Sequence, residues 1–520
     1  MAQEDLFGGD RPQWQTGIGF LFAAIGSAVG LGNIWRFPYV VYENGGGAFL
    51  IPYFVALITA GIPILMLEFA LGHKKKASAP KAFRIIDERW EWLGWWAVTF
   101  VMFGIVMYYI VVIGWCINFL FFSFGRVWGD DPNAFFFNTF LKASDVGTEG
   151  LWKGALSFRL PIVGAVLFVW IVNWFITFKG IEKGIEKAVK IMMPVLFIVT
   201  VTIIVWSLFL EGAGDGIRHY VTPDFKKVLN KEVWIAAYGQ IFFSLSLGFG
   251  IMIAYASYLP KKANVFKNSL IVGFTNSLYE VFAGFGVFSV LGYMALKQNA
   301  TIQEVVTSGI GLAFVAYPKA MSLLPLGNVF GVLFFFLLAI AGVSSSISII
   351  EAFTSAVIDK FNFPRKKVIT ITCVVGACGS MLFATRTGIY WLDIVDHFLN
   401  HYGLITVGVV ESLIIGWIYR TDQLKLHIVS QLGLSGRRHK IFNYIILRLW
   451  MYCIRFITPI ALGIAIVNSL MQEFVEPYGG YPISSIIILG VGWILVTHIF
   501  AFGVSGLPWQ KKDARIEELV

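Results

Sequence analysis

Two short stretches place polar and helix-breaking residues in the middle of apolar segments. Residues 23–38 read AAIGSAVGLGNIWRFP, and residues 240–250 read QIFFSLSLGFG. Small residues also allow helices to pack closely in a membrane. Unsatisfied backbone groups are costly in hydrocarbon, however, so an unwound stretch persists there where it lines a cavity or binds something. Hydroxyl, amide and freed carbonyl oxygens together suit a hard cation.

Polar residues in other apolar blocks agree with such a site. Asn276 and Glu280 are four residues apart and therefore share one helical face. The run AGVSSSIS at 341–348 adds hydroxyl groups, and Glu68 adds a second carboxylate. A carboxylate inside a membrane is costly enough to be a functional hypothesis by default. For Glu68 a structural role, as a cap for the broken helix in 23–38, has the same weight as a functional one.

The composition is that of an integral membrane protein. Of the 520 residues, 57% are hydrophobic and 14% are charged, whereas about 25% charged residues is ordinary for a soluble protein. The net charge of +9 comes from basic residues on alternate loops, which is the positive-inside pattern. This pattern predicts cytoplasmic termini and no nucleic-acid partner. The four cysteines lie in apolar blocks and predict no extracellular disulfide framework.

The apolar blocks predict twelve transmembrane helices in one all-α domain, 1–520, because a spanning helix needs about 20 apolar residues. The blocks lie near 16–40, 46–71, 92–124, 160–178, 191–210, 234–258, 268–296, 326–358, 368–384, 388–418, 443–470 and 483–503.

The two interrupted blocks are the first and the sixth spans. They begin two five-span units, 16–210 and 234–418, followed by two additional spans in 443–503. An odd number of spans in each unit requires the second unit to be inverted. Interrupted helices at corresponding positions of inverted repeats are a pointer to the binding site of a transporter.

Four motifs resemble those of the neurotransmitter:sodium symporter family. They are GSAVGLGNIWRFPYVVYENGGGAFLIPY (26–53), GIEKGIEKAVKIMMP (180–194), WIAAYGQIFFSLSLGFG (234–250) and AGVSSSI (341–347). The resemblance runs from about Arg11 to the end of the tenth span and is strongest to the bacterial amino-acid branch, typified by the leucine transporter. It implies the leucine-transporter-type fold, with spans 1 and 6 unwound at mid-membrane.

The resemblance also implies a set of site residues. The first sodium site comprises the Ala28 carbonyl, Asn33, Ser244, Asn276 and the substrate carboxylate. The second comprises the carbonyls of Gly26, Val29 and Ala341 with the hydroxyls of Ser344 and Ser345. The substrate pocket comprises Ala28, Gly30, Ile105, Tyr109, Phe243, Ser246, Phe249, Ser345 and Ile349, with Tyr109 donating to the carboxylate. The outer gate is formed by Arg36 and Asp396, and the inner gate by Arg11 and Asp359.

Two positions bear on the ligands. Chloride-dependent members of the family have Ser where this chain has Glu280, and that Ser helps to bind chloride beside Tyr53, Gln240 and Ser244. The carboxylate of Glu280 resembles the chloride-independent bacterial members, in which a fixed charge replaces the anion. Monoamine carriers have Asp at Gly30, so the glycine leaves room for a substrate that brings its own carboxylate.

The residues and the resemblance together predict a sodium-coupled symporter that imports a neutral, hydrophobic amino acid by alternating access, without chloride. The alternatives are a carrier of GABA, betaine or an aromatic amino acid, and a sensor that does not transport. The sequence shows neither a nucleophile paired with a base nor a catalytic metal cluster, so it does not indicate an enzyme. Asp393, His397 and His401 have metal-ligand spacing on a helix, but unconnected polar residues are the more frequent interpretation.

The cellular setting follows from the same features. Glu280 and the absence of an outer-loop disulfide favour a bacterial inner membrane, so the lipid bilayer is an expected partner. The oligomeric state stays open, with a dimer as one alternative.

Overall fold

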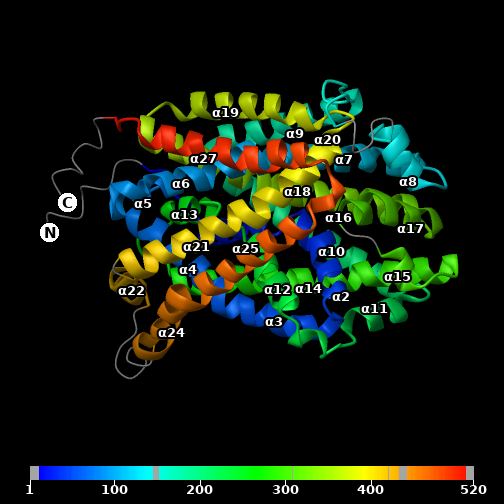
Figure 1. Cartoon of the computed structure of the whole chain (residues 1–520), viewed down its shortest axis with the longest axis horizontal. Helices are drawn as coiled ribbons and strands as arrows, with labels where there is room; N and C mark the ends of the chain where they lie inside the picture. The colour runs from blue at the N-terminus through cyan, green and yellow to red at the C-terminus, as the bar shows by residue number, and fades with distance from the viewer. Residues whose placement is uncertain (1–10, 145–150, 307–308, 420, 433–441, 511–520) are drawn as a thin grey trace.

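The computed structural model describes residues 11–144, 151–306, 309–419, 421–432 and 442–510. This part of the chain is almost entirely helical, and the helices pack side by side along the longest dimension of the molecule (Figure 1). The β-type pairing found in this part of the chain is an isolated bridge between Phe158 and Thr385. The all-α prediction is therefore confirmed.

Ten of the described helices are long and apolar enough to cross a membrane. They are Gly46–Lys75, Glu88–Gly125, Leu160–Phe178, Ile181–Leu208, Val265–Gln298, Gly327–Phe361, Arg365–Phe383, Gly388–Ile418, Leu447–Gly480 and Ile483–Ser505. Most bounds lie within a few residues of the predicted ones. The helix that ends at Leu208 begins at 181 rather than 191, because the charged stretch before Pro194 is helical too.

The first predicted span is divided into two helices. Helix α1 (Gly17–Ala28) and helix α2 (Leu31–Glu43) are bent by 53° at Val29 and Gly30, and together they count as an eleventh span. Helix α1 begins after Thr16, whose hydroxyl accepts a hydrogen bond from the backbone N–H of Gly19.

The sixth predicted span is divided as well, into α12 (Lys231–Ser244) and α13 (Ile251–Ser257). Between them Ser246, Gly248 and Gly250 have φ angles of 53°, 72° and 68°. A left-handed non-glycine residue such as Ser246 costs about 1–3 kcal/mol and persists where its surroundings fix it. Neither half is long enough to count as a span alone, so the described residues contain up to eleven candidate spans rather than the predicted twelve.

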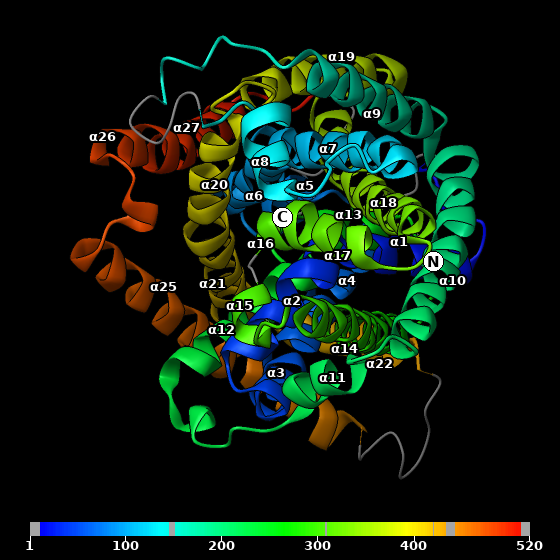
Figure 2. The same ribbon diagram turned by 90° about the vertical axis from the view of Figure 1, so that its right-hand side faces the viewer.

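The broken helices lie in the interior of the bundle. Helix α18 (Gly327–Phe361) packs along α7 (Val106–Gly125) and against α1, while α13 packs against α4 (Ile62–Lys75). Figure 2 shows α18 inside the ring of outer helices, with α9, α10, α19 and α25 at the periphery. The peripheral helices expose much of their apolar surface, as expected for a lipid-facing ring.

The two ends of the bundle carry different short helices. Helices α5 (Ala79–Ile86) and α22 (Thr421–Ser430) lie at one end, together with the basic residues that follow α4. We call this the basic end, and the charge pattern predicts that it faces the cytoplasm. Helices α11 (Ala213–Val221) and α17 (Tyr317–Leu323) lie at the opposite end (Figure 1). The terminal residues 1–10 and 511–520, also predicted to be cytoplasmic, lie outside the described residues.

Candidate functional site

The break between α1 and α2 frees two backbone carbonyls. In an uninterrupted helix the carbonyls of Gly26 and Ser27 would accept hydrogen bonds from the N–H groups four residues later. The N–H of Gly30 donates instead to Asn33 Oδ1 (2.8 Å), and the N–H of Leu31 donates to the Tyr109 hydroxyl (3.2 Å). The two carbonyls are therefore available to other partners.

Hydroxyl groups of α18 meet these carbonyls. Ser344 Oγ donates to the carbonyl of Gly26 (2.8 Å) or that of Ala341 (2.9 Å), and Ser345 Oγ lies 3.2 Å from the carbonyl of Ser27. We call these two hydroxyls and three carbonyls the serine cluster. It brings together Gly26, Ala341, Ser344 and Ser345 of the predicted second sodium site. That prediction includes Val29 and omits Ser27.

Side chains from α2, α12 and α14 (Val265–Gln298) form a second cluster. Asn33 Nδ2 lies 2.9 Å from Asn276 Oδ1 and 2.8 Å from Glu280 Oε1. Asn276 Nδ2 donates to Ser244 Oγ (2.5 Å), and Ser244 Oγ donates to Glu280 Oε1. We call Asn33, Ser244, Asn276 and Glu280 the asparagine cluster. It joins the three side chains of the predicted first sodium site to a carboxylate, and all four residues are buried.

The Glu280 carboxylate accepts hydrogen bonds from further neutral groups. The Tyr53 hydroxyl donates to Glu280 Oε2 (2.7 Å), and Gln240 Nε2 lies 3.4 Å from Glu280 Oε1. All of these described partners are neutral, so an ionised Glu280 would have no positive charge beside it. A buried charge is strongly disfavoured unless it is paired, so the cluster favours the arrival of a cation.

The second break is held by Glu68 and is tied to the first. Glu68 Oε1 accepts a hydrogen bond from the backbone N–H of Gly248 (2.7 Å). The interpretation of Glu68 as a cap for the first broken helix is therefore wrong, because the carboxylate caps the unwound part of the sixth span. Ser246 Oγ donates to the carbonyl of Ser27 (3.0 Å), which connects the two breaks directly.

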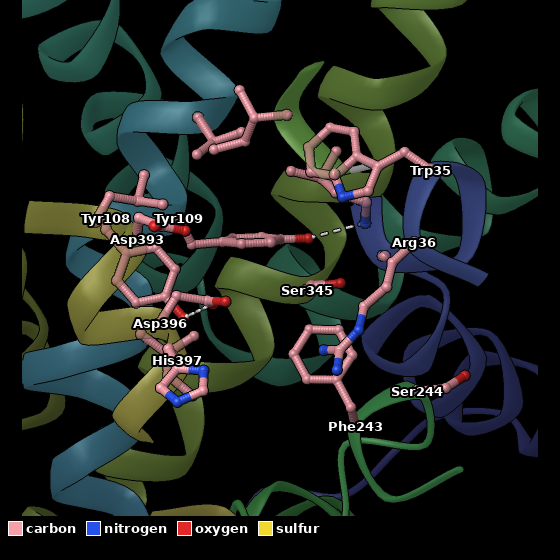
Figure 3. A pocket seen from close by; sticks show the side chains of 18 of the residues that line it. Trp35, Arg36, Tyr108, Tyr109, Phe243, Ser244, Ser345, Asp393, Asp396 and His397 are labelled. Carbon is pink, nitrogen blue, oxygen red and sulfur yellow. Dashed lines mark hydrogen bonds between the residues drawn. The ribbon is translucent and has the colours of Figure 1, made fainter. Parts of the chain in front are cut away.

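A cavity of about 580 Å³ lies beside both breaks. All nine predicted substrate residues line it: Ala28, Gly30, Ile105, Tyr109, Phe243, Ser246, Phe249, Ser345 and Ile349. Figure 3 shows the Tyr109 ring reaching across the cavity toward the backbone of α2. The volume is within the usual range for small-molecule sites, about 300–1,000 Å³.

Gly30 stands where the cavity meets the start of α2. A Cβ at this position would lie 3.0 Å from the Tyr109 hydroxyl and 3.2 Å from Ser345 Oγ. A side chain would have to displace one of these two oxygens, so the glycine keeps the helix start accessible from the cavity.

The cavity is closed toward the basic end. Arg11 Nη1 lies 2.7 Å and 2.9 Å from the two carboxylate oxygens of Asp359. Asp359 also accepts from the backbone N–H of Ser78 (2.8 Å), and the Trp14 indole donates to the carbonyl of Tyr255 (2.9 Å). Burial lowers the pKa of Arg11, but Asp359, together with Tyr258 and Glu351, outweighs this and leaves that pKa raised. The predicted inner pair is thus formed.

The predicted outer pair, Arg36 and Asp396, is not formed in the described structure. The Arg36 guanidinium lies over the Phe243 ring, 4.8 Å from its centroid. Asp396 instead accepts from the Tyr108 hydroxyl (2.5 Å) and from Asn400 Nδ2 (2.8 Å). Figure 3 shows Arg36 and Asp396 on opposite sides of the cavity, whose lining continues between them to α16 (Gly309–Gly311). The site is therefore open toward the opposite end.

The spacing of Asp393, His397 and His401 does not produce a metal site. The Asp393 carboxylate accepts from the hydroxyls of Tyr478 (3.0 Å) and Tyr481 (2.9 Å). His401 Nδ1 faces the carbonyl of His397 at 2.9 Å. Within the described residues, no group of three or more His, Cys, Asp or Glu side chains is placed to hold a metal ion.

Some buried polar residues were missed from the sequence. Glu411 lies inside the span Gly388–Ile418, and its Oε1 has no hydrogen-bond partner among the described residues. The rule that singled out Glu280, a carboxylate within an apolar block, would have found it. Tyr108 gives no such signal, because tyrosines are frequent in apolar blocks and its role depends on Asp396.

Comparisons with known proteins cover nearly the whole chain. A model of the sodium:neurotransmitter symporter family matches residues 11–143 and 130–505. An uncharacterized sodium-dependent transporter of Methanocaldococcus jannaschii is 43% identical over 481 residues, which cover 92% of this chain and 94% of that protein.

Two mammalian relatives are more distant. The human sodium- and chloride-dependent neutral and basic amino acid transporter B(0+) is 32% identical over 552 residues, covering 94% of this chain and 84% of that protein. The bovine sodium- and chloride-dependent creatine transporter 1 is 32% identical over 513 residues, covering 89% and 78%. The residues of both clusters lie within the range that the family model matches.

Proposed function

The chain belongs to the sodium:neurotransmitter symporter family, and we propose that it imports a neutral, hydrophobic amino acid with two sodium ions and without chloride. It is a sodium-dependent symporter and a multi-pass membrane protein, not an enzyme. The proposal concerns the substrate, the number of ions, the independence from chloride and the direction of transport.

The two oxygen clusters support two sodium sites. At the asparagine cluster, an ion would be held by the Ala28 carbonyl, Asn33, Ser244, Asn276 and the carboxylate of the substrate. At the serine cluster, an ion would be held by the carbonyls of Gly26, Val29 and Ala341 and by the two hydroxyls. Neutral and anionic oxygen ligands are what a hard cation prefers.

The observation that carries the substrate proposal is the contrast between the polar base and the apolar wall of the cavity. The N–H of Leu31 and the Tyr109 hydroxyl lie at the start of α2, where a helix favours negative charge. A substrate carboxylate fits there. The side-chain region is lined by Ile105, Phe243, Phe249 and Ile349, which favours a neutral amino acid such as alanine, valine, leucine or methionine.

Glu280 supports independence from chloride. The donors of Tyr53, Gln240 and Ser244 converge on its carboxylate, which would occupy the place that chloride takes in the chloride-dependent members of the family. The two mammalian relatives are named as chloride-dependent proteins. The proposed difference in chloride dependence between this chain and those relatives therefore rests on one side chain, that of Glu280.

The proposed architecture has twelve spans, with α12 and α13 together as the sixth, and two inverted repeats in 16–210 and 234–418. The described arrangement, open between Arg36 and Asp396 and closed at Arg11 and Asp359, would be outward-facing. Transport would then require closure of the first pair and separation of the second.

Uptake into liposomes tests the proposal. Purified protein would be supplied with radiolabelled leucine under an inward sodium gradient, under equal sodium and with potassium instead, each with chloride or gluconate. Accumulation driven by sodium in both anions is expected, with competition by alanine, valine and methionine. Competition by GABA, betaine or tryptophan alone would overturn the substrate assignment. Sodium-dependent binding without accumulation would favour a sensor.

A further inference from the structure

Two imidazole rings face each other at the basic end, away from the substrate cavity. His73 lies in the last turn of α4, and His427 lies in α22. His73 Nδ1 is 2.9 Å from His427 Nε2. The amide nitrogen of Gln431 is 2.8 Å from the first of these atoms and 2.9 Å from the second. We call these three side chains the histidine cluster.

Neighbouring groups fix the protons of this cluster. His73 Nε2 lies 2.9 Å from the carbonyl of Pro260 and must donate to it, so His73 Nδ1 carries a lone pair. Gln431 Oε1 accepts from the backbone N–H of Val265 (3.2 Å), which turns the amide N–H groups toward the rings.

With its Nε2 unprotonated, His427 presents a second lone pair, and the two N–H groups of the Gln431 amide donate one to each ring. The two ring nitrogen atoms then face each other as acceptors at 2.9 Å. A cation between the rings would serve both lone pairs in place of the amide.

We propose that His73 Nδ1 and His427 Nε2 bind a late divalent transition metal ion, such as Ni²⁺ or Zn²⁺. Rotation of the Gln431 amide, which gives up the 3.2 Å hydrogen bond from Val265, would bring the amide oxygen to the ion as a third ligand. Imidazole nitrogen suits both ions. The hydrogen bond from His73 to the Pro260 carbonyl is the outer contact by which proteins orient a ligating histidine.

The separation of the two nitrogen atoms is compatible with a shared ion. With metal–nitrogen distances of about 2.05 Å, a separation of 2.9 Å corresponds to an angle of about 90°, as in octahedral or square-planar coordination. Tetrahedral zinc needs about 3.3 Å, so the rings would move apart by about 0.4 Å. Nickel therefore fits the described arrangement with less change than zinc.

Charge around the cluster sets the expected strength. Lys74 and Lys76 follow closely after His73 in the chain and bring positive charge to this part of the basic end. Lys74 Nζ is directed to the carbonyl of Gln423 (2.9 Å). The lysines nevertheless repel a cation, so the site is expected to be weaker than a structural metal site.

The ion would join three parts of the basic end. Helix α4 ends the second span, Pro260 follows α13, and α22 follows the span that ends at Ile418. A bound ion would hold these elements together and slow the opening of the basic end. This consequence for transport rests on the proposed function, whereas the binding site itself does not.

Calorimetric titration of the full-length protein, purified without a histidine tag, tests the site with NiCl2 and ZnCl2 at neutral pH. We expect one ion per chain, with affinity reduced at least about tenfold in His73→Ala and His427→Ala. His219→Ala, which removes an exposed histidine of α11 at the opposite end, is the matched control and should leave the affinity unchanged.

His427→Gln provides a second variant should the alanine variants fail to fold. The metal should raise the melting temperature of the wild-type protein but not that of this variant. Absence of binding, or binding that survives His427→Gln, would overturn the site. Metal binding in a protein without sodium-driven uptake would leave the site standing and refute the proposed function. If bound metal leaves the rate of uptake unchanged, the ion does not slow the opening of the basic end, and that consequence is refuted.

Discussion

The asparagine cluster and the serine cluster lie on either side of the same break but are built differently. Side chains from three helices, including the Glu280 carboxylate, form the asparagine cluster. Backbone carbonyls and two hydroxyls form the serine cluster, which contains no formal charge. In the proposed function the Glu280 carboxylate would favour cation entry at the first cluster, whereas the second would mainly join α1 to α18.

Asn33 links the asparagine cluster to the start of α2. Its Oδ1 accepts from the backbone N–H of Gly30 (2.8 Å), while its Nδ2 donates to Glu280 (2.8 Å). A change at this cluster therefore reaches the place proposed for the substrate carboxylate. In the serine cluster Ser345 lines the cavity but Ser344 does not, so a change at Ser344 should affect substrate binding less.

The largest expected effect comes from Glu280→Ser, which removes the charge that distinguishes the clusters. The donors of Tyr53, Gln240 and Asn33 would lose their acceptor, at about 1–3 kcal/mol for each unpaired buried group. Uptake should become dependent on chloride, with a difference of about 100-fold between chloride and gluconate media, since about 1.4 kcal/mol is tenfold. Uptake by Ser344→Ala should be the same in chloride and in gluconate media. An active Glu280→Ser protein that ignores chloride would contradict the role of Glu280.

Asn276→Ala should weaken sodium and substrate binding together. The variant removes one proposed sodium ligand and the group that donates to Ser244 Oγ. A loss of about 10–100-fold is expected in both affinities, because hydrogen bonds to charged groups contribute about 1.5–3 kcal/mol. Equilibrium binding of radiolabelled substrate at several sodium concentrations measures both. A loss of sodium affinity with substrate binding intact would separate two ligands that the account places at one site.

Ser344→Ala should have a smaller effect, confined to sodium. The lost hydroxyl contacts neutral carbonyls, and such a hydrogen bond contributes about 0.5–1.5 kcal/mol. The apparent sodium affinity should fall about 3–10-fold, while substrate affinity at saturating sodium stays unchanged. Sodium titration of substrate uptake measures the first quantity, and competition binding measures the second. Lower substrate affinity at saturating sodium would remove the predicted difference between the clusters.

Gln240→Ala should have the smallest effect. Its contact with Glu280 is 3.4 Å long, and hydrogen bonds weaken at such distances, so uptake should change less than about threefold. The same substitution in a Glu280→Ser background should lower chloride affinity much more, because Gln240 would then donate to the anion. A double-mutant comparison of uptake against chloride concentration measures this difference. Equal effects in both backgrounds would place Gln240 outside the anion site.

The clusters and the cavity differ in how far the sequence could predict them. Polar residues such as Asn276 and Glu280, in apolar blocks, pointed to the site because burial makes them costly. The nine substrate residues were named only through the resemblance, since Ile105 or Phe249 alone looks like any core residue. Glu68 was interpreted as a cap for the first break but caps the second, because sequence spacing does not say which unwound segment its side chain reaches.

The gates and the histidine cluster could not be derived from spacing. Arg36 and Asp396 belong to helices that move relative to each other in the proposed cycle, so one conformation need not pair them. His73 and His427 are 354 positions apart, and their meeting depends on where α22 packs after the preceding span. Short spacing within one helix, as for His397 and His401, was a poor guide because the second ring turned toward the backbone.

Sodium affinity measured with and without saturating substrate, in the wild-type protein, Asn276→Ala and Ser344→Ala, tests the central claim most directly. Linkage is reciprocal, so a substrate carboxylate shared with one ion must tighten sodium binding. The account predicts that substrate tightens sodium binding in the wild type and in Ser344→Ala, but not in Asn276→Ala. Coupling that persists in Asn276→Ala and disappears in Ser344→Ala would contradict it, and would place the shared ion at the serine cluster.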